Sequence, residues 1–263
     1  MSHEFDEDTA LEPAGDGRFL GRYTSRWNVG PVPNGGYVLS VGLHALASSL
    51  DAPDPLCVTA HYLGRAVPGP VEVLVEVPKR GKTYSTATAR LLQGGKEHAR
   101  LLATFGDLSR EGRMRHVAGA PPEVPDADAP RVVAPFQDAI EIGARFDLRL
   151  APECAAWMNG GARRDEAEIR GRIRFADGRA PDVLSLPLFA DAFPPPVLEL
   201  VRPTWIPTLE LAVQLRARPV PGWLRCQFRT RFVMHGLLEE DGEIWDESGT
   251  LVALSRQLAI TPE

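Results

Sequence analysis

Residues 37–50 read Tyr-Val-Leu-Ser-Val-Gly-Leu-His-Ala-Leu-Ala-Ser-Ser-Leu, and this stretch decides how the chain folds. Its few polar residues are Ser40, His44, Ser48 and Ser49. We predict a helix here, preceded by the turn at residues 31–36 with Asn34 as its N-cap. A helix that is apolar on nearly every side must be buried nearly all round. A sheet that curls around the helix satisfies this requirement.

Period-two patterns predict the strands of such a sheet. Residues 71–77 alternate in this way, and in residues 224–232 arginine or glutamine alternates with Leu, Cys, Phe, Thr and Phe. The strands predicted for the first half of the chain are residues 17–29, 56–67, 71–79, 83–92 and 97–106. Those predicted for the second half lie near residues 145–150, 168–176, 208–217, 223–235 and 250–260. A shorter helix at residues 184–193, ended by Pro194-Pro195-Pro196, accompanies the second set.

A short repeat indicates that the two halves are related. Arg65-Ala66-Val67-Pro68-Gly69 recurs as Arg218-Pro219-Val220-Pro221-Gly222, and in both places a strand pattern precedes and follows the turn. Internal repeats of this kind indicate similar units in tandem. We therefore predict an acidic N-terminal tail at residues 1–16, an N-terminal unit at 17–106, a proline-rich linker crossing between units at 107–144, and a C-terminal unit at 145–263.

Composition excludes several classes of function. The chain has 29 Lys and Arg against 35 Asp and Glu, so its net charge of −6 disfavours nucleic acid as a partner. No apolar run reaches the roughly 18 residues that span a membrane. The cysteines, Cys57, Cys154 and Cys226, lie far apart and support neither a disulfide framework nor a zinc site. With an acidic start unlike a secretory signal, we expect a cytoplasmic protein without a membrane partner.

An antiparallel sheet wrapped around a central helix is the hotdog architecture, and the chain resembles the type II acyl-CoA thioesterases. The features that carry the resemblance are Pro33-Asn34-Gly35-Gly36-Tyr37, residues 188–192, residues 205–209, the Pro-Gly-Trp turn at 221–223, and the hairpin from Asp246 to Gln257. The resemblance implies an α+β double hotdog: two tandem antiparallel sheets, each wrapped around a central helix, packed as a pseudo-dimer. It also implies hydrolysis of acyl-CoA to free acid and CoA.

The resemblance further implies a catalytic set in the second unit. In the family an Asp, a Thr and a Gln hold the hydrolytic water, and the matching residues here are Asp191, Thr208 and Gln257. Thr204 is the rival to Thr208. Asp191 also breaks local rules, because it lies among apolar residues at the end of a short helix, where the helix dipole disfavours negative charge. The alternatives are that Asp191 caps the segment after Pro194 and that Gln257 is an ordinary solvent-facing residue.

The start of the first helix supplies the complementary candidates, Gly35 and Gly36 with Asn34. Backbone N–H groups at a helix start point beyond it, and glycine lets a thioester oxygen approach closely. We therefore predict an oxyanion and substrate-binding site there, with a tight turn plus N-cap as the alternative. In the expected mechanism Asp191 takes a proton from water, Gly36 N–H stabilises the oxyanion, and neither metal nor cofactor is required.

Three arginines, Arg225, Arg229 and Arg231, share one face of a predicted strand. Guanidinium groups bind phosphates well, so these residues are candidates for contact with CoA. An exposed basic strand face is the alternative. A fused pair of hotdog units often associates further through sheet edges or faces, so we also expect a homo-oligomer, a dimer of double hotdogs.

The two units are expected to differ in function. Aligned through the repeated turn, Asp191 falls opposite Val38 and Gln257 opposite Thr104, which predicts one active site per chain. Two other functions compete with the thioesterase. One is a non-catalytic acyl-CoA-binding or regulatory hotdog protein. The other is a hydratase or dehydratase, which needs a histidine paired with an acid at the helix.

Overall fold

The computed structural model of the chain describes residues 2–110, 112–131, 140–201 and 204–261. The elements of the first half are α1 (Glu4–Asp8), β1 (Glu12–Pro13), β2 (Arg18–Tyr23), the 3-10 helix η1 (Ser25–Trp27), β3 (Asn28–Val29), β4 (Val32–Pro33), α2 (Gly35–Ser48), β5 (Asp54–Tyr62), β6 (Gly69–Lys79), β7 (Ser85–Gln93) and β8 (Lys96–Gly106). Those of the second half are η2 (Glu141–Arg145), β9 (Phe146–Leu150), α3 (Pro152–Ala155), η3 (Ala156–Asn159), β10 (Ala167–Phe175), α4 (Leu186–Phe189), η4 (Pro196–Glu199), β11 (Thr208–Leu215), β12 (Leu224–Thr230), β13 (Val233–Met234), β14 (Leu237–Trp245) and β15 (Leu251–Ile260).

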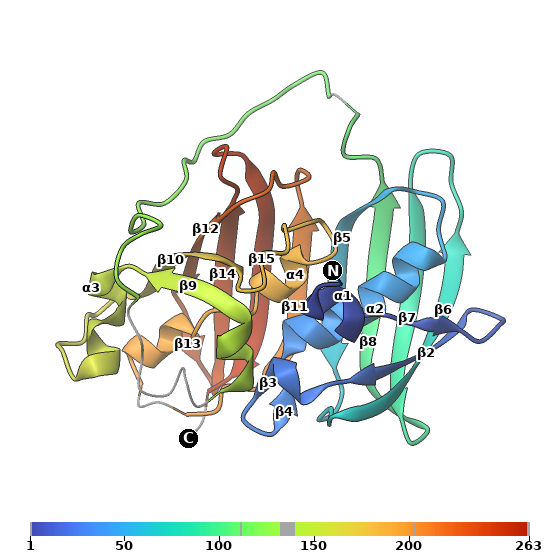
Figure 1. Cartoon of the computed structure of the whole chain (residues 1–263), viewed down its shortest axis with the longest axis horizontal. Helices are drawn as coiled ribbons and strands as arrows, with labels where there is room; N and C mark the ends of the chain where they lie inside the picture. Colours follow the sequence, from blue (N-terminus) through green and yellow to red (C-terminus); the bar gives the residue numbers. More distant parts are fainter. Residues whose placement is uncertain (1, 111, 132–139, 202–203, 262–263) are drawn as a thin grey trace.

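Within the described residues, thirteen strands form one large antiparallel sheet. Its order is β1-β2-β6-β7-β8-β5 through the first half and β11-β15-β14-β12-β10-β9 through the second, with β13 beside β14. The halves join where β5 pairs with β11 and Ala60 lies opposite Leu211. Figure 1 shows the two halves side by side, with α2 against the strands of one and α4 against those of the other. The predicted α+β double hotdog is confirmed, and its two sheets are continuous through the β5–β11 pair.

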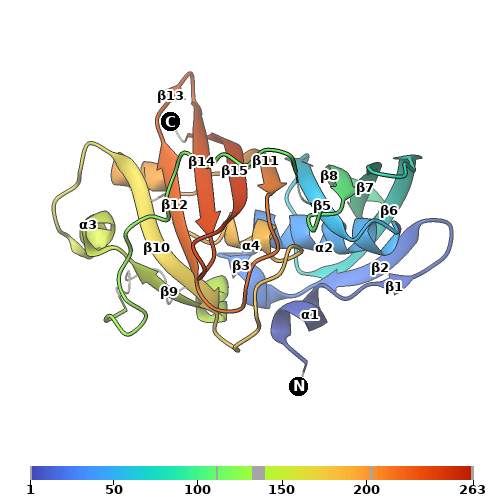
Figure 2. The same cartoon turned by 90° about the horizontal axis from the view of Figure 1, so that it is seen from above.

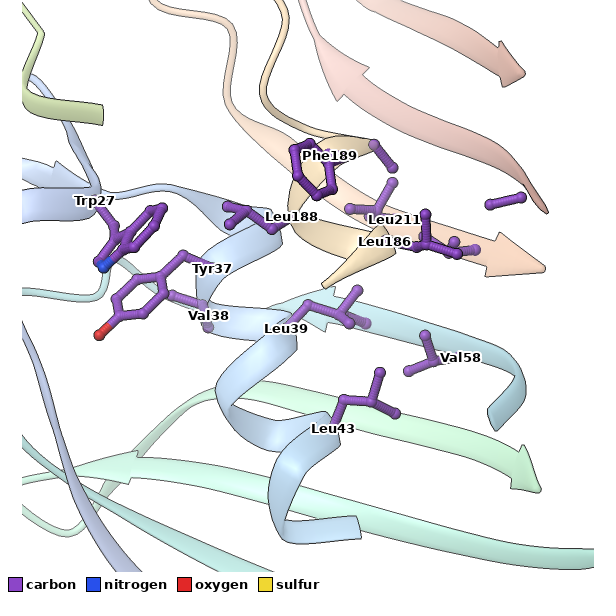
Figure 3. Close-up of a cluster of buried hydrophobic side chains, with 14 of the residues drawn as sticks. Trp27, Tyr37, Val38, Leu39, Leu43, Val58, Leu186, Leu188, Phe189 and Leu211 are labelled. Carbon is purple, nitrogen blue, oxygen red and sulfur yellow. The ribbon is translucent and has the colours of Figure 1, made fainter. Parts of the chain in front are cut away.

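Helix α2 is buried as its apolar sequence predicts. Leu39, Leu43 and Leu46 have no exposed surface. Figure 3 shows Leu39 and Leu43 in the cluster of side chains that α2 shares with α4 and the neighbouring strands. The N-cap prediction is also confirmed, because Asn34 Oδ1 accepts a hydrogen bond from the Tyr37 backbone N–H at 3.0 Å.

The repeated turn has the same backbone conformation in both halves. Gly69 has a φ of 141° and Gly222 a φ of 128°, values that favour glycine over residues with a side chain. Each glycine lies at or just before the start of a strand, β6 in the first half and β12 in the second. The sequence repeat therefore corresponds to a repeated structural feature.

Helix α4 and strand β14 of the second half differ from the sequence-based expectation. Helix α4 is shorter than the predicted helix at 184–193, because Asp191 N–H bonds to Leu188 O and this tighter turn ends the helix. Strand β14 lies between the predicted strands at 223–235 and 250–260 and was not predicted. Its polar run at 239–243 gives it the composition of a loop.

The segments outside the two units also contribute to the structure. Residues 4–8 of the acidic start form α1, and its Phe5 is fully buried beside Trp27 and Phe175. After β8 the chain crosses from the first half to the second along one edge of the molecule (Figure 1, green), as Figure 2 shows from above. Residues 111 and 132–139 of the expected linker lie outside the described residues. None of the described helices is long and apolar enough to cross a bilayer.

Candidate active site

A cavity of about 770 Å³ lies between the start of α2, the end of β5 and the segment that follows α4. Most of the side chains around it are apolar, and they include Val38, Ile142, Phe146, Phe193, Trp205 and Leu209. A mainly apolar hollow with a few polar groups is typical of a small-molecule site. The polar groups therefore decide what chemistry the cavity supports.

Asp191 borders this cavity and lies against the N-terminus of α2. Its Oδ2 accepts hydrogen bonds from Gly36 N at 2.8 Å and from Asn34 Nδ2 at 2.9 Å. Asn34 Nδ2 also donates to the Asp191 backbone oxygen at 2.8 Å. The positive end of the α2 dipole favours a carboxylate there. The N-terminus of α2 therefore offsets the unfavourable dipole of the short helix that precedes Asp191. Asp191 does not cap the segment after Pro194, because the 3-10 helix η4 in that segment has no side-chain cap.

The glycines at the start of α2 allow this contact. A Cβ on Gly36 would lie 2.6 Å from Pro187 O and 2.9 Å from Asp191 Cβ. Real side chains do not tolerate such distances, so glycine is needed for the start of α2 to approach the end of α4. In the structure the Gly36 N–H and the Asn34 amide donate to Asp191 and not to open space where a thioester oxygen was predicted.

Burial raises the pKa of Asp191 from 3.8 to about 6, although hydrogen bonds from Gly36, Asn34 and Gly35 lower it. The carboxylate is therefore mostly ionised at neutral pH and is still basic enough to accept a proton. Tyr62, which also borders the cavity, donates its hydroxyl to Gly35 O at 2.8 Å and fixes the same turn.

Gln257 and Thr208 border the same cavity as Asp191. Thr208 is the first residue of β11, and Gln257 lies on the inward face of β15 with 5% of its surface exposed. The solvent-facing alternative for Gln257 is thus wrong, because Leu258 and Ile260 lie on the exposed face of β15 instead. Thr204 borders the cavity as well, so the structure brings both threonine candidates to the site.

The three arginines proposed for CoA lie elsewhere. None of them borders the cavity. Arg229 Nε donates to Glu168 Oε2 at 2.5 Å, and Arg231 Nη2 donates to Asp241 Oδ2 at 2.5 Å. Arg65 borders the cavity instead, is exposed, and makes no ion pair within the described part of the chain. The one feature of the sequence that distinguishes Arg65 is its position as the first residue of the repeated turn.

His98 is another cavity residue that the sequence analysis missed. Its Nε2 lies 3.0 Å from the Tyr23 hydroxyl, and burial lowers its pKa to about 4, so the ring is neutral at pH 7. Nothing in its sequence context distinguishes it from a packed strand histidine. Among the described residues, no group of three or more His, Cys, Asp or Glu side chains could hold a metal ion.

The fold and the cavity are those of a double-hotdog protein with one carboxylate held at a helix start. Comparison of the sequence with known families gives the same result more specifically. Residues 23–106 match the acyl-CoA thioesterase N-terminal domain, and residues 118–261 match the acyl-CoA thioesterase C-terminal domain. The chain belongs to this acyl-CoA thioesterase family. Family membership supports a hydrolase that acts on thioesters.

Similar proteins extend over almost the whole chain. A crystal structure from Thermobifida fusca, described as a candidate thioesterase II, is 31% identical, covers 99% of this chain and 98% of its own, and superposes with a TM-score of 0.90. A hot dog protein of unknown function from Alicyclobacillus acidocaldarius is 25% identical and has a TM-score of 0.88. The match covers 100% of this chain and 99% of that protein. An uncharacterized Mycobacterium tuberculosis protein is 27% identical over 93% of this chain and 91% of its own.

Proposed function

We propose that this protein is an acyl-CoA thioesterase that hydrolyses acyl-CoA to free acid and CoA with a water activated by Asp191. One observation supports this most strongly: Asp191 is held by Gly36 N–H at the start of α2 and borders a mainly apolar cavity together with Gln257 and Thr208. A partly buried carboxylate with a pKa of about 6 is suited to accept a proton near neutral pH.

In the proposed reaction Gln257 and Thr208 hold a water beside Asp191. Asp191 takes one proton from this water, and the water oxygen attacks the thioester carbonyl. The tetrahedral intermediate then expels the CoA thiolate, the carbon–sulfur bond breaks, and the proton on Asp191 passes to the leaving sulfur. Free thiols have a pKa of about 8.5, so the thiolate is a good leaving group. No covalent intermediate forms on the protein.

Gly36 N–H has a changing role in this scheme. It donates to ionised Asp191 before the reaction, at 2.8 Å. A hydrogen bond to a carboxylate weakens when that carboxylate becomes protonated. The negative charge meanwhile moves to the thioester oxygen, so we propose that the Gly36 N–H hydrogen bond is then shared with this oxygen. Such a donor typically contributes about 3 kcal/mol to an acyl-transfer transition state.

The remaining walls suit the two ends of the substrate. Apolar side chains such as Phe193 and Trp205 accommodate an acyl chain. Exposed Arg65 is the proposed contact for CoA phosphates. The secondary candidates for contact with CoA phosphates are Arg225, Arg229 and Arg231. They rank below Arg65 because Arg229 and Arg231 already pair with carboxylates.

A thiol-release assay across acyl-CoA chain lengths tests the proposal. We expect hydrolysis of at least one acyl-CoA by the wild-type protein. The alternative is a non-catalytic acyl-CoA-binding or regulatory protein, and it is favoured by the engagement of Gly36 N–H with Asp191 in the structure. Binding of acyl-CoA without thiol release supports that alternative. The dimer of double hotdogs and the cytoplasmic location stay predictions, testable by light scattering and cell fractionation.

A further inference from the structure

A row of polar side chains crosses the inner face of the sheet next to Asp191. Gln257 on β15 is the register partner of Glu240 on β14. The β12–β14 register, continued by one residue beyond Arg229 and Asp241, brings Thr230 opposite Glu240. Side chains of register partners lie on the same face of a sheet, with Cβ atoms about 5 Å apart. The row therefore starts at the cavity, with Gln257, and continues into the core.

The register partners on the other side of Gln257, towards the first half of the sheet, are apolar. The same register runs from Gln257 to Leu211, then to Ala60 and Leu101. All three of these residues are at most 1% exposed. The row is thus polar on the β14 side of Gln257 and apolar on the β11 side. Buried polar residues that break the local pattern in this way often serve a site.

The row contains oxygens that lack hydrogen-bond partners. Gln257, Glu240 and Thr230 are 5%, 8% and 6% exposed. Within the described residues, Gln257 Oε1, Glu240 Oε2 and Thr230 Oγ1 are buried and have no partner. An amide oxygen and a carboxylate oxygen both only accept hydrogen bonds. Neither oxygen can therefore serve as the donor that the other lacks. A proton on Glu240 supplies this donor, because a carboxylic acid can donate a hydrogen bond to the amide oxygen of Gln257.

The surroundings of Glu240 favour this protonated form. Burial raises the pKa of Glu240 well above its ordinary value, and the negative charges of Asp191, Glu239 and Asp241 raise it further. Asp191 differs, since the N–H groups of Gly36 and Asn34 stabilise its ionised form. Burial without a compensating donor therefore favours the protonated form of Glu240, whereas the donors around Asp191 favour its ionised form.

We propose that Glu240 is a positioning residue for the hydrolytic water and acts through Gln257. Its protonated carboxyl donates to Gln257 Oε1 and turns the Gln257 amide so that Nε2 faces the cavity. Nε2 then donates to one lone pair of the water, while Asp191 accepts a water proton and the second lone pair attacks the thioester. Without Glu240 the amide can flip and offer the water an acceptor instead. This inference rests on the proposed thioesterase function.

Two variants of Glu240 separate hydrogen-bond donation from packing. Glu240→Gln keeps the shape and supplies an amide donor for Gln257 Oε1, and Glu240→Met keeps an unbranched chain of similar volume but donates nothing. Glu239→Gln is the matched control, because Glu239 is the neighbouring residue and points to the other face of β14. Both Glu240 variants are also made in the Gln257→Ala background. The readouts are kcat and KM from thiol release, with circular dichroism as the check on folding.

We expect Glu240→Gln to keep kcat within about threefold of wild type, as Glu239→Gln does. Glu240→Met is expected to lose about 10- to 100-fold in kcat, with KM changed by less than about threefold. This is the range found when a residue that orients a metal-binding side chain is replaced, and Glu240 is proposed to orient Gln257 in the same way. In the Gln257→Ala background Glu240→Met is expected to cause no further loss. Equal losses in the Gln and Met variants, an unchanged kcat in Glu240→Met, or losses that multiply with Gln257→Ala each overturn the proposal.

A measurement without substrate keeps the two proposals distinguishable. The side-chain carboxyl carbon of Glu240, assigned in the ¹³C spectrum by its absence in Glu240→Gln, is expected at the position of a protonated acid at pH 7. An ionised Glu240 overturns the inference whether or not the protein cleaves thioesters. If wild type cleaves no acyl-CoA, the proposed function fails, and the carbon spectrum still decides the protonation of Glu240. If Glu240→Met does not fold, a loss of more than tenfold in Glu240→Gln overturns the proposal.

Discussion

Replacement of Asp191 by Asn separates the two roles that its position allows, proton acceptor and anionic cap of α2. Asn keeps an oxygen that can accept from Gly36 N–H but cannot take a proton from water. Burial raises the pKa of Asp191 from 3.8 to about 6. Because one pKa unit corresponds to about 1.4 kcal/mol, the folded protein disfavours the ionised carboxylate by about 3 kcal/mol. Because Asp191 is only partly buried, screening by solvent reduces this to about 2 kcal/mol.

The native state binds the Asp191 proton more tightly than the unfolded chain does, because its pKa is higher. Wild-type stability contributed by this group is therefore fully present below about pH 4, falls between about pH 4 and 6, and stays at its lower value above that window. Asp191→Asn lacks this loss. In urea unfolding at pH 8 we expect the variant to be about 2 kcal/mol more stable than wild type. Near pH 4 the two proteins are expected to have similar free energies of unfolding.

The same variant is expected to lose at least about 100-fold in kcat in the thiol-release assay, since the general base is gone. Asp165→Asn is the control, because Asp165 is exposed and lies outside the cavity. Hydrolysis at the wild-type rate by Asp191→Asn refutes the role as base. A variant that is less stable than wild type at pH 8 refutes the stability reasoning and shows that the anionic cap outweighs the cost of burial.

Four further expectations follow from the site. Wild-type kcat/KM is expected to rise with pH through about 6 as Asp191 loses its proton, and a flat profile across pH 5–7 contradicts this. Gln257→Ala is expected to lose about 100-fold in kcat with little change in melting temperature; an unfolded variant means that Gln257 is structural. Gly36→Ala, whose Cβ would lie 2.6 Å from Pro187 O, is expected to cost about 2–3 kcal/mol in urea unfolding, whereas a Cβ on Gly112 has room and Gly112→Ala serves as its control. Arg65→Gln is expected to raise KM for acyl-CoA about fivefold at low salt but not for an N-acetylcysteamine thioester, and equal changes for both substrates refute a phosphate contact.

The parts of the fold that follow from local pattern were predictable. The apolar stretch at residues 37–50 predicts α2 because so few of its side chains can face water, and α2 is buried. The repeated turn predicts two related halves, and Gly69 and Gly222 share a positive φ. Strand β14 was not predicted, because Glu239, Glu240, Asp241 and Glu243 give it the composition of a loop. Its hydrogen bonds to β12 and β15 stabilise the strand despite this composition.

The arrangement of the site depends on contacts between residues that are distant in sequence. The local sequence predicts Asp191 at the unfavourable end of a short helix, but its carboxylate accepts a hydrogen bond from Gly36 N–H, 155 residues earlier in the chain. The more apolar side of β15 suggested that Gln257 faces solvent. In the structure Leu258 is exposed and Gln257 is buried, because the inner face of the sheet carries polar residues at this point. Sequence periodicity could reveal neither the Asp191–Gly36 hydrogen bond nor the burial of Gln257.

Attack by water on the thioester, with Asp191 as base, is tested most directly by a single turnover in ¹⁸O-labelled water. Enzyme in excess over acyl-CoA is allowed to react once, and the product acid and the peptide that contains Asp191 are analysed by mass spectrometry. We expect one ¹⁸O atom in the product acid and none in Asp191. Unlabelled acid together with ¹⁸O in Asp191 would mean that the carboxylate attacks the thioester itself, and that result contradicts the proposed mechanism.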